Sequence, residues 1–243
     1  MFKQHVQGNH TVLSHPKYTS QITLDWFDAN FWQQQNKIVG AKKGRATAWF
    51  FKQDKLTAVL RHYWRGGLVG KLLSDQYLYP GLEQTRVYKE FSLMSKLIEL
   101  GLNVPIPIAA KVTRSGLIYR GDIITEAVTG AKSVLDILIK RSLTNDELER
   151  IAKTIALFHS KGVYHADLNI NNILFNDIGD VYIIDFDRGE IKTPNVQWQQ
   201  SNIERLERSF LKEQGRNKTF NWQVSDWQAL HSNYLKAYKA LVN

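Results

Sequence analysis

The pattern of hydrophobic and polar positions changes several times along the chain, and each change predicts a different element. The first 36 residues mix polar and aromatic side chains, and DWFDANFW at residues 25–32 predicts a short helix or turn. From about residue 37 to residue 72, runs rich in β-branched and aromatic residues predict three strands: IVGA, GRATAWFF and LTAVLRHYW. The segments KKG and KQDK between them are typical of hairpin connections.

Residues 85–100 follow a helical period. Apolar side chains recur at spacings of four, three and four residues, at Val87, Phe91, Met94 and Ile98. Gly101 stands where a left-handed C-cap ends a helix, and the prolines at 105 and 107 prevent its resumption. Two more strands are expected from PIAAKVTR and LIYRGDIITEAV.

A second helix is predicted over residues 144–160, where Thr144 and Glu147 have the spacing of a capping box. Two short strands, ILF and VYIIDF, flank the turn NDIGD, and the chain beyond about residue 198 is again helical in pattern. This order predicts an α+β fold in two lobes. The N-terminal lobe, residues 1–128, is β-rich with one main helix; the C-terminal lobe, residues 129–243, is helical with a small β-hairpin.

Composition excludes several classes of protein. The chain has 243 residues, of which 43% are hydrophobic, so it is long enough to bury a core. It has no cysteine, which excludes disulfides, thiolate catalysis and cysteine-ligated metal sites. The start lacks the apolar core of a signal peptide, and no window approaches 18 uncharged apolar residues. We therefore expect a soluble, cytosolic chain.

The positive charge is concentrated in one segment. The formal net charge is +9, and residues 37–71 contain nine Lys or Arg against one acid, Asp54. Aromatic residues are interleaved with these cations. Such a segment suits nucleic acid, nucleotide phosphates or an anionic lipid surface, and a solvated basic face is equally compatible with it.

The candidate chemistry lies in HADLNINNILFNDIGDVYIIDFDRG, residues 165–189. His165, Asp167, Leu168 and Asn172 match H-x-D-L-x-x-x-N, and Asp185 follows Asp167 by eighteen residues. Phosphoryl transfer needs a carboxylate beside the attacking hydroxyl and oxygen ligands for Mg²⁺. Asp167 suits the first task, and Asn172 and Asp185 suit the second. A single acid here would more often cap a turn, but the joint match favours phosphoryl transfer from a nucleotide.

With these residues the chain resembles the bilobal protein-kinase-like fold, which implies further positions in the N-terminal lobe. Gly44 stands at the expected phosphate-covering hairpin, and Arg61 stands where such kinases carry a Lys. Glu90, on the helix of residues 85–100, is placed to pair with Arg61, although an exposed helix charge is the alternative. Glu126 falls where the hinge strand of such folds meets adenine; a solvated acid at a strand end is equally consistent.

Three departures from protein kinases indicate a small or lipid-linked acceptor. Asp187 replaces the usual Gly, Asn169 replaces the usual Lys, and no A-P-E follows in the roughly fifty residues after residue 190. Further strings, including RHYWRGGLVGKL, GVYHADLNINNILF, IIDFDRG and WQQSNIERLERSF, resemble the bacterial 3-deoxy-D-manno-octulosonic acid (Kdo) kinases of the lipopolysaccharide kinase family. The likeness runs from about Lys42 to Phe210, and it makes Arg61 and Asp187 expected features.

The resemblance implies phosphorylation of the Kdo 4-hydroxyl on Kdo-lipid IVA, with ATP and Mg²⁺, by a peripheral protein on the cytoplasmic face of the bacterial inner membrane. Trp64, Arg65 and Gly66-Gly67 would then meet the anionic headgroup, unless they form an ordinary strand connection. We expect a monomer that binds no nucleic acid. A kinase of another core sugar, such as heptose, and a catalytically silent kinase fold that acts as a binding module are the alternatives.

Overall fold

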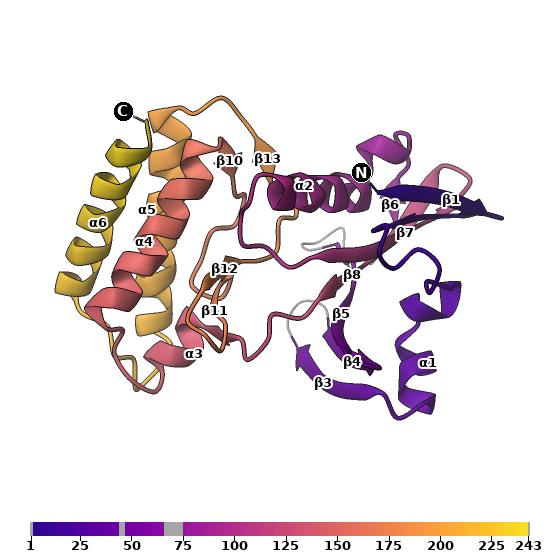
Figure 1. Cartoon of the computed structure of the whole chain (residues 1–243), viewed down its shortest axis with the longest axis horizontal. Helices are drawn as coiled ribbons and strands as arrows, with labels where there is room; N and C mark the ends of the chain where they lie inside the picture. Colours follow the sequence, from indigo (N-terminus) through magenta and orange to yellow (C-terminus); the bar gives the residue numbers. More distant parts are fainter. Residues whose placement is uncertain (1, 44–46, 66–74, 243) are drawn as a thin grey trace. The chain divides into compact units, whose positions relative to one another are not determined.

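The computed structural model describes residues 2–43, 47–65 and 75–242 (Figure 1). Its contacts divide the chain into two compact units. The first contains residues 1–96 and 105–127, and the second contains residues 97–104 and 128–243. Residues 97–104 therefore group with the second unit, although the sequence pattern placed them in the N-terminal lobe. The reason is a pair of hydrogen bonds between this segment and a hairpin of the second unit. Asn103 makes both of those bonds: its carbonyl accepts from Ile183 N at 3.1 Å, and its side chain donates to Val181 O at 3.2 Å.

The first unit is built on an antiparallel sheet with the order β1-β2-β7-β8-β5-β4-β3, and β6 pairs with β8. Its strands are β1 (Lys3–Gln7), β2 (His10–Ser14), β3 (Ile38–Lys43), β4 (Thr47–Gln53), β5 (Leu56–His62), β6 (Tyr77–Leu78), β7 (Pro107–Ser115) and β8 (Ile118–Glu126). The strands expected between residues 37 and 128 are confirmed. The β1–β2 hairpin was not predicted, because every residue of β1 is exposed and no apolar period marks it.

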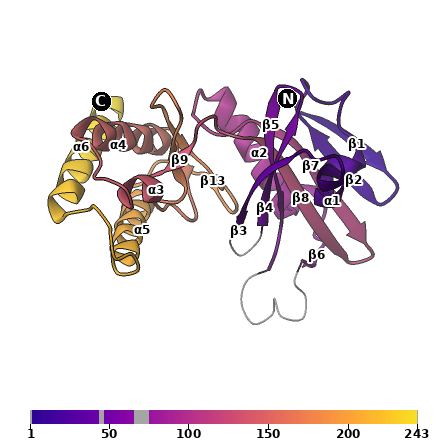
Figure 2. The ribbon, with the colours of Figure 1, turned by 90° about the horizontal axis from the view of Figure 1, so that it is seen from below.

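The two faces of this sheet carry different elements (Figure 2). Helix α2 (Arg86–Glu99) covers one face, where it approaches β8 at Gly121. A Cβ on Gly121 would lie 2.0 Å from Val87 Cγ2, so only glycine admits the helix here. The other face packs against η1 (Leu24–Phe27) and α1 (Ala29–Gln34), which confirm the short helix expected at residues 25–32. The ring of Trp32 stacks on Phe51 of β4, with the centroids 4.1 Å apart.

The second unit is mainly helical, as expected. It contains α3 (Val134–Leu138), α4 (Asn145–Ser160), α5 (Val196–Gln214) and α6 (Val224–Val242), and α4 packs along α6. The capping box is confirmed: Glu147 N donates to Thr144 Oγ1 at 3.2 Å, and Thr144 N donates to the Glu147 carboxylate at 2.8 Å. A Cβ on Gly162 would lie 2.1 Å from a backbone carbonyl, which explains the glycine after α4.

Small strand pairs complete the second unit and hold its loops. Strands β11 (Ile173–Phe175) and β12 (Val181–Ile183) form the expected hairpin, and β9 (Lys132–Ser133) pairs with the other edge of β11. Strand β10 (Val163–Tyr164) pairs with β13 (Glu190–Ile191). The α+β class, with strands concentrated in the first unit and helices in the second, is confirmed. In the described residues, no helix combines the length and the apolar character that crossing a membrane requires.

Candidate active site

The loop between β10 and β11 is fixed by a buried histidine. Asp167 N donates to His165 Nδ1 at 3.1 Å, so the ring proton lies on Nε2, which donates to Ile184 O at 3.0 Å. Burial lowers the pKa of His165, although the hydrogen bond to the Ile184 carbonyl opposes this effect. A neutral imidazole in one tautomer therefore ties the backbone of Asp167 to the residue that precedes Asp185.

The β11–β12 hairpin brings Asn172 beside Asp185. Ile173 pairs with Ile183, and Ile184 N donates to Asn172 O at 3.0 Å. Asn172 therefore lies opposite Ile184, the residue that precedes Asp185. Asn172 is buried, and its side-chain nitrogen donates to Asp167 O at 3.0 Å. That bond leaves Oδ1 as the part of the Asn172 side chain suited to a cation. The structure thus brings Asp167, Asn172 and Asp185 together, as their spacing predicted.

The segment after β12 has an unusual backbone. Asp185 has φ of 65° and Arg188 has φ of 60°, a left-handed conformation that costs a residue with a side chain. A turn that includes the bond from Gly189 N to Phe186 O, 2.8 Å long, holds the second of them. Strained backbone of this kind concentrates at functional sites, where the surrounding structure maintains it.

Helix α5 fastens the same loop from the other side. Asn202 is 1% exposed; its Oδ1 accepts from His165 N and its Nδ2 donates to His165 O, both at 3.1 Å. Two turns further along, Ser209 Oγ accepts from Ile170 N at 3.2 Å. Sequence reasoning missed these residues. The available signal was Asn202 itself, a polar residue beside Ile203 on the apolar stripe of α5.

A cation from α5 stands at the carboxylate of Asp167. Arg205 Nη1 lies 3.4 Å from Asp167 Oδ1, and the two side chains are 45% and 63% exposed. Asn169, at the position where protein kinases carry Lys, instead closes the loop: its side chain donates to Asp167 O at 2.8 Å and accepts from Asn171 N at 2.9 Å. The positive charge beside Asp167 therefore comes from the helix.

In the first unit, Arg61 of β5 donates to the carboxylate of Glu90 on α2. Glu90 is buried at 2% exposure, and it also accepts from the hydroxyl of Tyr63. The guanidinium of Arg61 lies over the Tyr63 ring at 5.5 Å from the centroid. The expected pairing of Arg61 with Glu90 is present, and its alternative, an exposed helix charge, is wrong because α2 buries this carboxylate.

The remaining expected positions fare differently. Glu126, at the end of β8, is not simply solvated: its carboxylate accepts from the Tyr18 hydroxyl and lies 3.6 Å from Lys17 Nζ. Gly44 and the pair Gly66-Gly67 lie outside the described residues. Trp64 is 45% exposed, and the guanidinium of Arg65 lies 5.1 Å from the Tyr77 centroid.

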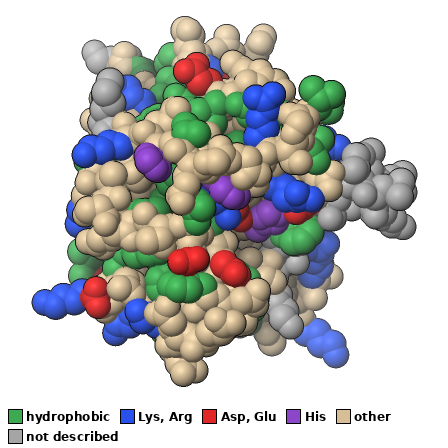
Figure 3. Space-filling view, turned by 90° about the vertical axis from the view of Figure 1, so that its right-hand side faces the viewer, with side chains coloured by type: hydrophobic (Ala, Val, Ile, Leu, Met, Phe, Trp, Pro, Cys, Tyr) green, Lys and Arg blue, Asp and Glu red, His purple; other side chains and the backbone are tan. Residues whose placement is uncertain are grey.

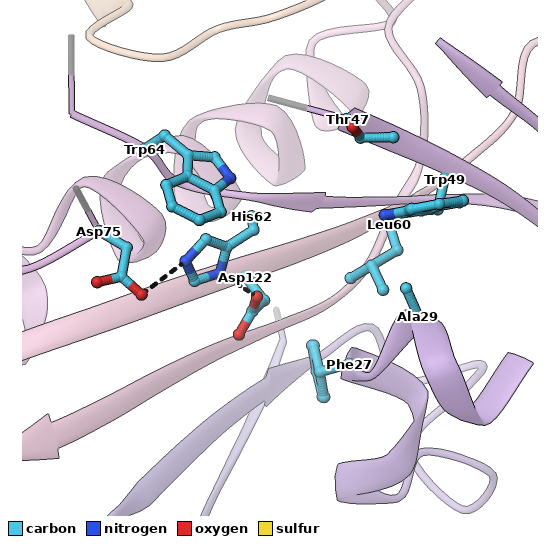
Figure 4. A pocket seen from close by; sticks show the side chains of 9 residues that line it. All are labelled: Phe27, Ala29, Thr47, Trp49, Leu60, His62, Trp64, Asp75 and Asp122. Atoms are coloured by element: carbon cyan, nitrogen blue, oxygen red, sulfur yellow. Dashed lines mark hydrogen bonds and ion pairs between the residues drawn. The ribbon is translucent and has the colours of Figure 1, made fainter. Parts of the chain in front are cut away.

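A cavity of about 550 Å³ opens on the first unit, lined in part by Leu60 and His62 of β5 (Figure 4). Successive side chains of a strand point to opposite faces of the sheet, so Arg61, between these two residues, faces away from the cavity. Histidine, acidic and basic side chains gather on the face shown in Figure 3. In Figure 4 the ring of His62 lies between Asp75 and Asp122, with Trp64 beside it. His62 Nδ1 is 2.6 Å from Asp122 Oδ1, and Nε2 is 3.3 Å from Asp75 Oδ2.

The charge of this cluster is shared among several partners. Burial by itself lowers the pKa of His62, but the two carboxylates outweigh it, and the net pKa is raised. Lys111 also contacts Asp122 at 3.2 Å, and Arg120 contacts Asp75 at 2.8 Å. Sequence reasoning missed the cluster, because His62 and Asp122 meet only through the pairing of β5 with β8.

The sequence also matches the model of a known protein family. The sequence model of the lipopolysaccharide kinase (Kdo/WaaP) family matches residues 29–234. The chain belongs to this family. The matched range includes strand β5 with Arg61, the loop between β10 and β11 with Asp167 (the catalytic-type loop), and helix α5, which bonds to this loop.

Individual members of the family are similar over nearly their whole length. A 3-deoxy-D-manno-octulosonic acid kinase of Vibrio vulnificus (strain YJ016) is 42% identical over 234 residues, covering 96% of this chain and 98% of that protein. The same-named protein of Haemophilus influenzae (strain 86-028NP) is 36% identical over 239 residues, covering 95% and 98%. A solved structure of WbdD with a kinase inhibitor matches at a TM-score of 0.47 and 14% identity; the match covers 83% of this chain and spans 45% of that one.

Proposed function

We propose that this protein transfers the γ-phosphoryl group of ATP to a hydroxyl of Kdo in the lipopolysaccharide core. The observation that carries the proposal is the fixed arrangement of Asp167, Asn172 and Asp185 around the buried ring of His165. The similar proteins are named as Kdo kinases, which supports Kdo as the acceptor. We assign the attacking group to the 4-hydroxyl of Kdo and the acceptor molecule to Kdo-lipid IVA.

Asp167 would accept the proton of the attacking hydroxyl. Arg205 faces Oδ1 of this carboxylate, which makes Oδ2 the oxygen for the acceptor. General bases placed in this way contribute roughly 10²- to 10⁴-fold to a rate. The bonds from His165 and Asn172 to the backbone of residue 167 would keep the carboxylate oriented during the reaction.

Mg²⁺ suits the donors in the second unit. Asn172 offers Oδ1 and Asp185 offers a carboxylate, and hard cations of this kind prefer oxygen ligands. Within the described part of the chain, no group of three or more His, Cys, Asp or Glu residues could hold a metal. The phosphates of ATP would therefore have to complete the coordination. When bound, Mg²⁺ supplies charge neutralisation on the phosphoryl oxygens.

We assign the binding of ATP phosphates to the first unit, through Arg61. A guanidinium presents several N–H donors in a plane and grips phosphate with two of them. Glu90 of α2 and Tyr63, which directly follows β5, would hold it in position. Gly44 would cover the phosphates, and Glu126, whose carboxylate accepts from the Tyr18 hydroxyl, would lie near adenine.

We further propose that the protein works as a monomer, peripheral on the cytoplasmic face of the inner membrane. The basic segment of residues 37–71 supports this idea, because a lipid-linked acceptor presents an anionic headgroup. Exposed Trp64 suits the membrane interface, where aromatic side chains settle.

The test uses the purified chain with Mg-ATP and Kdo-lipid IVA, with product detected by mass spectrometry. Asp167→Asn should lower turnover by at least about 100-fold. Asp177→Asn, an exposed acid in the β11–β12 turn, is the matched control and should leave turnover unchanged. Retained turnover in Asp167→Asn would refute the role of Asp167. Phosphorylation of a heptose-bearing core but not of Kdo-lipid IVA would make the protein a heptose kinase.

A further inference from the structure

Among the residues that the structure describes, the basic side chain in contact with the carboxylate of Asp167 is that of Arg205. Helix α5 sets its position. Asn202 and Ser209 of α5 bond to the backbone of the loop on either side of Asp167. Residues 202, 205 and 209 recur at spacings of three and four, so they share one face of the helix. These bonds hold the backbone of Arg205 at a fixed place relative to Asp167.

The ion pair itself contributes little to stability. It is formed by one nitrogen and one oxygen at 3.4 Å, between side chains that are 45% and 63% exposed. Exposed pairs of this geometry are worth about 0–1 kcal/mol. A guanidinium has five N–H donors, and a single contact to Asp167 leaves a planar pair of donors that fits another carboxylate.

The acceptor in the proposed function is an acid. Kdo is an octulosonic acid, so at neutral pH it brings a carboxylate into a site that already contains the negative charges of Asp167 and Asp185. Like charges brought together in this way repel one another. The site therefore needs a cation that meets the sugar carboxylate while a hydroxyl of the same small sugar reaches Asp167.

We propose that Arg205 binds the carboxylate of the sugar-acid acceptor and so places its hydroxyl against Asp167. The inference rests on the proposed function and adds the residue that selects an acidic acceptor. Arg205 releases one contact with Asp167 Oδ1, or shares it, and takes the carboxylate with two parallel N–H donors. The neutral Asn169, whose side chain is engaged within the loop, leaves this position to Arg205.

The experiment compares two acceptors, Kdo-lipid IVA and the same molecule with the Kdo carboxylate converted to the primary amide. The amide keeps the shape and removes the charge. The full chain should prefer the acid by roughly 10- to 100-fold in kcat/KM, the range of a charge-assisted hydrogen-bond pair. Arg205→Gln should lose that preference by turning over the acid more slowly, whereas Arg205→Lys should keep part of it.

A matched control is available one turn away on the same helix. Arg208, which lies 3.8 Å from Glu204, carries the same charge without contacting Asp167, so Arg208→Gln should leave the preference intact. Two results would overturn the inference: the unaltered protein uses acid and amide equally, or Arg205→Gln lowers both to the same extent. The second result would place Arg205 on the phosphoryl group. Turnover of neither acceptor by the unaltered protein would instead refute the proposed function, and the inference with it.

Discussion

The contact that fastens the catalytic-type loop to α5 rests on the side chain of Asn202. It is 1% exposed and makes two hydrogen bonds of 3.1 Å to the backbone of His165, one as acceptor and one as donor. Asn202→Ala would leave a buried N–H and a buried C=O without partners. Each unsatisfied group costs about 1–3 kcal/mol, so we expect a loss of roughly 2 to 6 kcal/mol in the free energy of unfolding.

The same substitution should also slow the reaction. His165 positions the backbone of Asp167, and a shift of about 1 Å in a catalytic group can cost about 100-fold in rate. We therefore expect kcat to fall at least tenfold in the folded variant. Urea denaturation followed by circular dichroism measures the first effect, and steady-state turnover with saturating Mg-ATP measures the second.

The control for this prediction is Gln200→Ala, a change on the exposed side of α5 that should alter the free energy of unfolding by less than about 0.5 kcal/mol. The reasoning would be refuted if Asn202→Ala were as stable as this control. It would also be refuted if the variant lost stability but kept its full kcat, because the loop would then hold its position without α5.

Three further predictions concern other groups. Glu90→Gln leaves the partly buried Arg61 without its anion, so we expect a loss of about 2 kcal/mol in stability and a higher KM for ATP; an unchanged KM would contradict the phosphate role of Arg61. The pKa of His62 is raised above 6.5 in the folded state, so its charged form stabilises the fold below about pH 6.5, and this contribution is lost as pH rises through the folded pKa. The stability difference between the unaltered protein and His62→Gln should therefore shrink as the pH rises above about 6.5 in urea titrations, and a constant difference would show that folding does not raise the pKa of His62. Asp185→Ala should weaken Mg²⁺-dependent ATP binding in calorimetry by at least about tenfold, whereas affinity independent of this residue would remove it from the metal site.

Local features were predictable because nearby residues determine them. The cap of α4 follows from Thr144 and Glu147 alone, and the proximity of Asn172 to Asp185 follows from a short hairpin between them. The pairing of Arg61 with Glu90 was expected only because the chain resembles the kinase-like fold, in which a cation on a strand meets an acid on the next helix. In each case the relevant contacts lie within about thirty residues or on one regular element.

Contacts set by tertiary packing were not predictable from the same reasoning. Asn202 and His165 are 37 residues apart in sequence, and no local rule directs α5 onto the loop. His62 meets Asp122 because β5 and β8 are neighbours in a sheet whose strand order does not follow the sequence. Strand β1 has five exposed residues, so it lacks the alternation by which a strand is predicted.

The measurement that tests the central claim most directly is mass spectrometry of the lipopolysaccharide core from a strain in which this gene is deleted. The account predicts that the core loses one phosphate, located on Kdo, and that the unaltered gene restores it while the Asp167→Asn gene does not. A core that keeps its Kdo phosphate after deletion, or that loses a phosphate from heptose instead, would contradict the claim.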